Sequence, residues 1–93
     1  MEFEWDESKN QKNKRLHGID FTDAANIFLD PFYVEEEDTR QDYGEQRFKV
    51  IGEVNWQILV VIYTYRDKKN RIISARKAES YERRKYYQNY PPS

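Results

Sequence analysis

Residues 47–78, with the sequence RFKVIGEVNWQILVVIYTYRDKKNRIISARKA, decide the fold. The first part alternates apolar with polar residues, which is the pattern of a half-buried strand and predicts a strand at 47–54. Residues 57–65 are apolar on both sides and rich in branched side chains, which predicts the central strand of a sheet. A turn at 55–56 and a hairpin turn at 67–70 connect these strands to a last strand at 71–78, so we expect antiparallel pairing.

Two helices are predicted before this stretch. The first spans residues 7–17, with Asp6 as its N-cap, Gly18 in the left-handed position that ends it and Leu16 as its apolar anchor. The second is a short helix at 24–29, which Thr22 caps and Asp30-Pro31 stops.

Residues 32–36 are predicted to form an edge strand, because their acidic side chains would discourage pairing with other chains. A charged helix is predicted from 80 to about 87, followed by a loose tail at 88–93. The 93 residues are enough for one modest core, so we expect a single α+β domain over residues 1–93. Its predicted architecture is two N-terminal helices, a four-stranded antiparallel sheet and a C-terminal helix, with the helices on one face of the sheet.

The composition excludes several classes of function. Cysteine is absent, so disulfides and thiolate metal sites are ruled out and a cytoplasmic location is expected. A single histidine excludes a multi-histidine metal site, and the unspaced acids at 35–38 are a poor ligand set, so no metal or cofactor is expected. No apolar run is long enough to span a membrane, and no secretion signal opens the sequence.

The net charge of −1 hides an asymmetry along the chain. Residues 20–46 carry nine acids and one base, whereas residues 66–87 carry nine bases and three acids. The basic end favours an anionic partner such as nucleic acid. The alternative is that both charged regions are only solvated surface.

The sequence lacks a glycine-rich phosphate loop, a G-x-S-x-G elbow and an H-E-x-x-H motif. Cleavage of RNA needs less machinery, because the 2′-hydroxyl of RNA can attack the adjacent phosphate. The protein must align this attack, stabilise negative charge on the phosphate and move protons. The side chains suited to these roles are His17, Arg47, Arg76, Glu82 and Tyr86, with Lys14, Lys77 and Arg83 as candidate RNA contacts.

Each candidate also has a structural explanation. Arg76 and Glu82 could form only a salt bridge between strand and helix. Tyr86, four residues after Glu82 on the same helix side, could simply cover the sheet. His17 could only stabilise the end of the first helix through its charged form.

Together these residues resemble the BrnT toxin family. The resemblance rests on Phe3-Glu4-Trp5-Asp6, Lys9, Asn13, His17-Gly18, Phe21, Ala24-Ala25, Phe28, Asp30-Pro31, Arg47, Gly52, the run from Arg71 to Ala78, Glu82-Arg83 and Tyr86. It implies a RelE-type ribonuclease fold and a toxin that cuts RNA and arrests translation and growth. It also implies a partner, a BrnA-like antitoxin with a ribbon–helix–helix DNA-binding domain, through which the toxin would reach promoter DNA only indirectly. We expect acidic and apolar residues of the antitoxin to cover the basic face.

Within this resemblance Arg76, Glu82 and Tyr86 match the C-terminal motif of the family, His17 the His-Gly that closes its first helix, and Arg47 its arginine at the second strand. The leading hypothesis is a metal-independent endoribonuclease. Arg76 and Arg47 would stabilise the phosphate, Glu82 or His17 would transfer protons, and Tyr86 would orient the substrate or stack on a base. The alternatives are a non-catalytic nucleic-acid or partner-binding module, and a degenerate toxin that retains only antitoxin binding.

Overall fold

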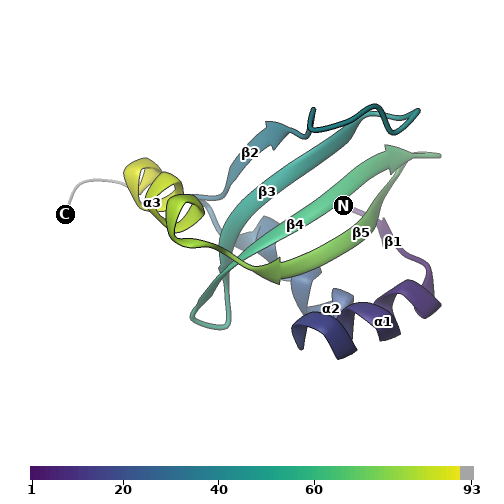
Figure 1. Ribbon diagram of the computed structural model, residues 1–93, viewed down its shortest axis with the longest axis horizontal. Helices are drawn as coiled ribbons and strands as arrows, with labels where there is room; N and C mark the ends of the chain where they lie inside the picture. Colours follow the sequence, from purple (N-terminus) through teal and green to yellow (C-terminus); the bar gives the residue numbers. More distant parts are fainter. Residues whose placement is uncertain (91–93) are drawn as a thin grey trace.

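The strands predicted within residues 47–78 form the centre of a five-stranded sheet in the computed structural model, which describes residues 1–90 (Figure 1). The strands are β1 Phe3–Glu4, β2 Val34–Glu37, β3 Arg47–Val54, β4 Gln57–Arg66 and β5 Lys69–Lys77. The helices are α1 Glu7–His17, α2 Phe21–Ala24, the 3-10 helix η1 Ala25–Leu29 and α3 Ser80–Asn89. Across the sheet the order is β1-β5-β4-β3-β2.

The α+β class is confirmed, but a sheet of four antiparallel strands is not. Strands β2 to β5 are antiparallel as expected, and β1 adds a parallel fifth strand that pairs with β5 at Asn70 and Arg71. A strand of two residues is too short to show an alternation, and its partner lies far along the chain. The pairing therefore left no local signal at Phe3 and Glu4.

The first helix has the predicted bounds, with Asp6 as its N-cap and Gly18 at φ 70° as its C-cap. The second helical region differs from the prediction. Asp20, rather than Thr22, caps α2, because its carboxylate accepts from the Thr22 N–H. The predicted helix at 24–29 is instead the end of α2 followed by a 3-10 helix, η1. Within residues 1–90, no helix is both long and apolar enough to cross a membrane.

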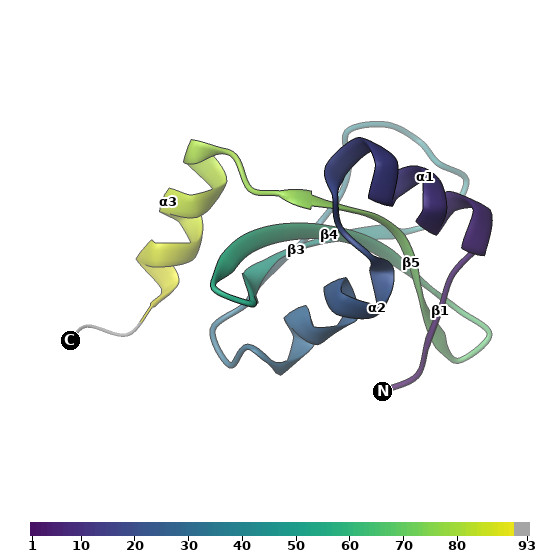
Figure 2. The same ribbon diagram turned by 90° about the horizontal axis from the view of Figure 1, so that it is seen from below.

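The helices cover both faces of the sheet, which corrects the prediction that they lie on one. On one face α1, α2 and η1 pack against a core that includes Phe21, Ile27 and Val61. On the other face Tyr86 of α3 packs against a smaller cluster that includes Val60. Helix α3 thus lies apart from α1 and α2 (Figure 2). Because β4 is apolar on both sides, each face of the sheet needs a cover.

Helix α3 also runs further than predicted. It ends at Asn89, so residues 88 and 89 are helical rather than a loose tail. Tyr90 is the C-cap of the helix, and the last three residues of the predicted tail, 91–93, lie outside the described residues.

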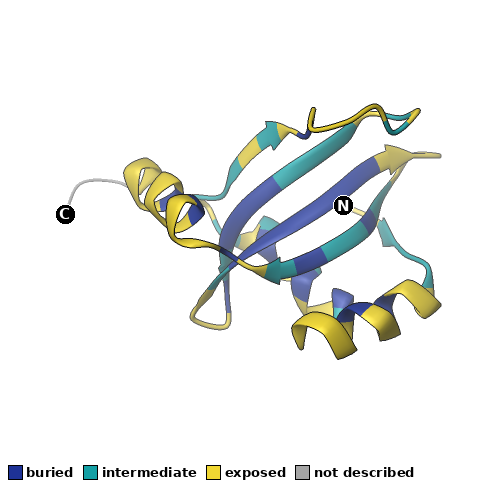
Figure 3. Ribbon diagram, in the orientation of Figure 1, coloured by how far each residue is buried: buried dark blue, intermediate teal, exposed yellow. Residues whose placement is uncertain are grey.

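Polar contacts, rather than Leu16, hold α1 to the sheet. Leu16 is 67% exposed, and the buried residues of α1 are Asn10 and Asn13. Most of the helix is exposed (Figure 3). The Asn13 amide donates to the carbonyl oxygens of Ile19 and Ala75, and its oxygen accepts from the Ala75 N–H. Asn13 thus replaces a neighbouring strand at the edge of β5, beyond the point where β1 ends.

Replacing Asn13 with alanine is expected to lower the free energy of unfolding by about 2–4 kcal/mol, because two carbonyls and one N–H lose a buried partner. Urea unfolding followed by circular dichroism measures this change. Lys12→Ala, an exposed change on the same helix, is the control and should alter stability by less than about 0.5 kcal/mol. Equal effects of the two changes would contradict this role of Asn13.

Candidate functional site

The candidate site is built around Glu82 of α3, whose side chain is fully buried. Local sequence places it there. Glu79 is the N-cap of α3 and Glu82 is the third residue of the helix, so the Glu82 carboxylate turns back and accepts from the Glu79 N–H over 2.8 Å. This capping interaction holds the carboxylate where the chain passes from β5 into α3.

Two cations from the sheet meet the Glu82 carboxylate. The Arg76 guanidinium of β5 donates to both oxygens, over 2.7 Å to Oε1 and 2.8 Å to Oε2. The Lys49 Nζ of β3 lies 2.6 Å from Oε2. The Tyr81 hydroxyl lies 3.2 Å from the same oxygen. We call Lys49, Arg76 and Glu82 the central cluster.

The protonation of Glu82 follows from these contacts. Burial alone would raise the pKa of Glu82, but hydrogen bonds from Arg76, the Glu79 N–H and Lys49 outweigh it and hold this pKa well below its usual range. The carboxylate is therefore ionised at any pH near neutrality, with both oxygens engaged. Its geometry suits a group that fixes the positions of Arg76 and Lys49 rather than one that accepts a proton.

Arg76 retains donors that point away from Glu82. A guanidinium has five N–H donors. Three have partners: one Nη1–H and one Nη2–H bind Glu82, and the other Nη1–H binds the Lys77 carbonyl. The Nε–H and the second Nη2–H have no partner within residues 1–90. These two donors form the other fork of the guanidinium, and the side chain is 28% exposed. Such a fork matches two oxygens of a phosphate.

The register of the sheet decides which side chains share the face of the central cluster. Arg76 pairs with Val60, which packs on the α3 side, whereas Lys77 pairs with Leu59, which packs on the other side. Arg76 and Lys77 therefore lie on opposite faces. Simple alternation along the strand would place Ile72 on the same face as Arg76, but an irregularity in the pairing of β4 with β5 turns Ile72 to the opposite core.

Lys49, whose side chain is only 13% exposed, was not among the residues predicted from the sequence. In the alternating pattern of β3, Lys49 takes a polar position, which is typical of an outward-facing residue of a half-buried strand. A signal was present, since Lys49 lies two residues from Ile51 and so on the same face. The sequence did not show that this face is covered at one end by α3. That contact is what buries Lys49 and places it beside Glu82.

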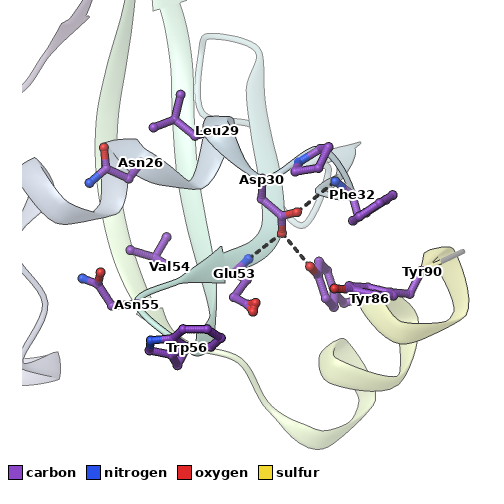
Figure 4. A pocket seen from close by; sticks show the side chains of 11 residues that line it. Asn26, Leu29, Asp30, Phe32, Glu53, Val54, Asn55, Trp56, Tyr86 and Tyr90 are labelled. Atoms are coloured by element: carbon purple, nitrogen blue, oxygen red, sulfur yellow. Dashed lines mark hydrogen bonds between the residues drawn. The ribbon is translucent and has the colours of Figure 1, made fainter. Parts of the chain in front are cut away.

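Tyr86 lies one turn after Glu82 and points into the protein. Its side chain is buried, and its hydroxyl donates to Oδ2 of Asp30 over 2.6 Å (Figure 4). Burial, together with the bond to Asp30, raises the pKa of the Tyr86 phenol above its usual value. The contact ties α3 to the end of η1, so the geometry favours an anchoring role over direct contact with a substrate.

Arg47 and His17 are not part of the central cluster, although Arg47 is only two residues from Lys49 on the same strand. The β3 residue in line with Arg76 is Ile51, so Arg47 lies four residues further along its strand, a distance of about 13 Å. There it pairs with Glu45 and stacks over the Tyr43 ring at 4.0 Å. His17 is exposed on the last turn of α1, whose C-terminal end lies beside the end of β5 in both ribbon views (Figures 1 and 2).

The candidate RNA contacts are exposed cations near the end of β5. Lys77 has no carboxylate partner within residues 1–90, and Arg83 binds only the Ala78 carbonyl and the Ser80 hydroxyl. Lys14 of α1 is 44% exposed and makes a long ion pair of 3.6 Å with Asp20. We call Lys14, Lys77 and Arg83 the basic rim.

The acidic stretch at 35–38 has partners inside the protein. Glu35 accepts from the Tyr63 hydroxyl over 2.6 Å, and Glu36 accepts from Lys85 of α3 over the same distance. Asp38 is buried, and hydrogen bonds from Arg40 lower its pKa to about 2. Two of these four acids therefore bind neighbouring elements and a third binds its own loop, which gives the stretch a structural explanation.

The model of a known protein family matches this chain. The model of the family described as the ribonuclease toxin BrnT of type II toxin–antitoxin systems matches residues 5–82. The match covers most of the chain, contains the whole central cluster and ends before Tyr86. No curated protein matches the sequence.

Proposed function

The chain belongs to the BrnT family of type II toxin–antitoxin ribonuclease toxins, and from this premise we propose that it is an endoribonuclease whose active site is the central cluster. The nucleophile in this proposal is the 2′-hydroxyl of the RNA itself. The 2′-oxygen attacks the adjacent phosphorus, the bond to the 5′-oxygen breaks, and a 2′,3′-cyclic phosphate forms. The products carry a cyclic phosphate on one side of the cut and a 5′-hydroxyl on the other.

The single observation that carries the proposal is the unoccupied fork of Arg76. Attack on phosphorus places additional negative charge on the two non-bridging oxygens. The Nε–H and Nη2–H of Arg76 are spaced to bind two such oxygens, while Glu82 holds the opposite edge of the same guanidinium. Donors fixed before the reaction stabilise developing charge without reorganising, which is the usual source of large rate effects.

Glu82 and Tyr86 enter the proposal as positioning residues. Glu82 orients Arg76 and Lys49, and Tyr86 anchors the helix that carries Glu82. We propose His17, an exposed side chain on the last turn of α1, for proton transfer, since imidazole is the side chain that enzymes use most often for this step. The basic rim binds the phosphates of the RNA. Arg47, on the same face of the sheet as the central cluster, contacts the RNA further along.

The identity of the fragment ends tests this mechanism. We expect the purified protein to cut a 5′-labelled RNA in EDTA and to leave 2′,3′-cyclic phosphate and 5′-hydroxyl ends, because no metal-activated water is involved. The same RNA with 2′-deoxynucleotides at the cut sites should resist cleavage. Fragments with 5′-phosphate ends, or equal cutting of the deoxy substrate, would contradict attack by the 2′-hydroxyl.

A parallel reaction with translating ribosomes separates the remaining alternatives. Cutting of messenger RNA on ribosomes, with free RNA left intact, would identify a ribosome-dependent endoribonuclease and would agree with arrest of translation and growth. Absence of cutting in both reactions would overturn the enzymatic proposal and favour a binding module.

A type II toxin has a protein antitoxin as its partner. We propose that this antitoxin is BrnA-like, with a ribbon–helix–helix domain through which the pair reaches its promoter. The RelE-type ribonuclease fold is likewise part of the proposal, and the α+β architecture with a C-terminal helix against the sheet supports it.

A further inference from the structure

A groove of about 590 Å³ lies between the end of η1, the C-terminal part of α3 and the hairpin that joins β3 to β4 (Figure 4). Three exposed apolar side chains from separate elements border it. Trp56 of the hairpin is 95% exposed, Leu29 at the end of η1 is 79% exposed, and Tyr90 beyond α3 is 45% exposed. Large apolar side chains gathered at one exposed place mark a surface that binds another molecule.

The backbone at Trp56 gives no folding reason for this residue. Asn55 and Trp56 have φ values of 50° and 70°, which is the two-residue hairpin turn that favours asparagine followed by glycine. A bulky residue rarely adopts this conformation. The β4–β5 hairpin has the same turn, with φ values of 53° and 65°, and there the two positions are the polar residues Asp67 and Lys68. Trp56 is therefore strained and exposed at a position where a polar residue serves equally well.

The charges in the groove define what it can hold. The lining contains two carboxylates, Asp30 and Glu53, and no cationic side chain. Asp30 accepts from the Phe32 N–H, the Glu53 N–H and the Tyr86 hydroxyl. The Glu53 carboxylate has no hydrogen-bond or ion-pair partner within residues 1–90, and it points into the groove between Asp30 and Trp56 (Figure 4).

An occupant that covers Trp56 also takes Glu53 out of water, so the occupant must bring a positive charge. A cation over a tryptophan ring gains further from the electrostatic attraction of the ring. RNA is excluded as the occupant because two carboxylates repel its phosphates. The groove therefore fits an arginine or lysine side chain flanked by apolar residues, which is the chemistry of a protein segment.

We propose that this groove docks a cationic, apolar-flanked segment of the antitoxin. The proposal takes its occupant from the type II toxin–antitoxin assignment, and it adds an attachment surface separate from the basic rim. Because Tyr86 contacts Asp30 at the groove while Glu82, one turn earlier, holds Arg76, a segment bound here also contacts the helix that supports the central cluster.

The test measures binding of the antitoxin encoded with the toxin, by calorimetric titration without RNA, to the wild type and three variants. Trp56→Gly should weaken binding by about 30-fold or more, as loss of an aromatic anchor does, while leaving the melting temperature equal or higher because glycine relieves the turn. Glu53→Lys should weaken binding by at least about tenfold, since it places like charges together. Lys68→Gly, at the matching position of the other hairpin, should bind as the wild type does.

Other outcomes would overturn the proposal. Wild-type affinity in Trp56→Gly and Glu53→Lys would show that the groove is not the docking surface. Weak binding by Trp56→Gly alone would show that the occupant is not cationic. If the free protein sediments as a dimer and Trp56→Gly sediments as a monomer, the occupant is a second copy of the chain. If Trp56→Gly loses RNA binding, the occupant is RNA. RNA cleavage, assayed separately, should persist in Trp56→Gly and Glu53→Lys. An absence of RNA cleavage by the wild type would therefore contradict the proposed endoribonuclease activity and not the docking surface.

Discussion

Arg76→Ala is expected to lower the rate of RNA cleavage by about 10²–10³-fold, the usual effect of removing one preorganised donor from a developing oxyanion. The alanine variant loses the fork that faces the phosphate as well as the bond to Glu82. The measurement is the single-turnover rate with a labelled RNA. Arg66→Ala is the matched control, because Arg66 is an exposed arginine at the opposite end of the sheet, and its rate should stay within about threefold of the wild type.

Arg76→Lys separates charge from geometry. Lysine retains a cation beside the buried Glu82, so the fold should be kept, but it has no planar fork for two phosphate oxygens. We expect a melting temperature close to that of the wild type and a rate reduced nearly as far as in Arg76→Ala. A rate near that of the wild type would contradict the fork, because it would show that a point charge is sufficient.

Glu82→Gln is expected to lower the free energy of unfolding by about 3 kcal/mol, because it leaves the two cations of the central cluster without their buried counter-charge. Cleavage should fall as well, since Arg76 and Lys49 are no longer held in place. Glu37→Gln, an exposed change on β2, is the control and should alter stability by less than about 0.5 kcal/mol. A stable but inactive Glu82→Gln protein would instead favour Glu82 as a proton acceptor.

The pH dependence of stability gives a second measure of Glu82. Its folded pKa is lowered from the ordinary value of 4.5, so the stability it contributes is fully present above pH 4.5 and is lost as the pH falls toward the folded pKa. The stability difference between the wild type and Glu82→Gln should therefore be constant near neutrality and shrink below about pH 4.5. A difference that grows in acid would contradict the lowered pKa.

The elements with local patterns were predictable from the sequence. The alternation and turn residues of 47–78 predicted β3, β4 and β5, and Asp6 and Gly18 predicted both ends of α1. Local patterns could not reveal pairing at a distance. Strand β1 is too short for a periodicity, and Asn13 is identified as an edge partner only once Ala75 is known to lie beside it.

The position of α3 on the sheet could also not be predicted, because it depends on contacts between distant parts of the chain. Its sequence is highly charged, and only Glu82 and Tyr86 are buried. The helix packs on the face opposite α1 because its polar groups find partners there, including Glu36 for Lys85 and the Phe32 carbonyl for Asn89. Such contacts follow from tertiary structure and leave no hydrophobic period in the sequence.

The candidate residues of the site were predictable in part. The shared helix side of Glu82 and Tyr86 follows from spacing, and a salt bridge between Arg76 and Glu82 was one of the interpretations that the sequence left open; the structure contains both. Lys49 joins them only through the register of three strands. Arg47 is an arginine, the residue type that suits a phosphate, but it lies far from Arg76. The residue type alone does not reveal this distance.

The central role of Arg76 in the proposed mechanism is to act on the phosphate during cleavage and not merely in binding. The most direct test compares wild type and Arg76→Ala in two quantities: affinity for a 2′-O-methyl RNA that cannot be cut, and single-turnover rate on the matching RNA at saturating protein. The account predicts that affinity falls by less than about tenfold while the rate falls by about 10² or more. A loss of affinity with an unchanged rate at saturation would contradict it and make Arg76 a binding residue.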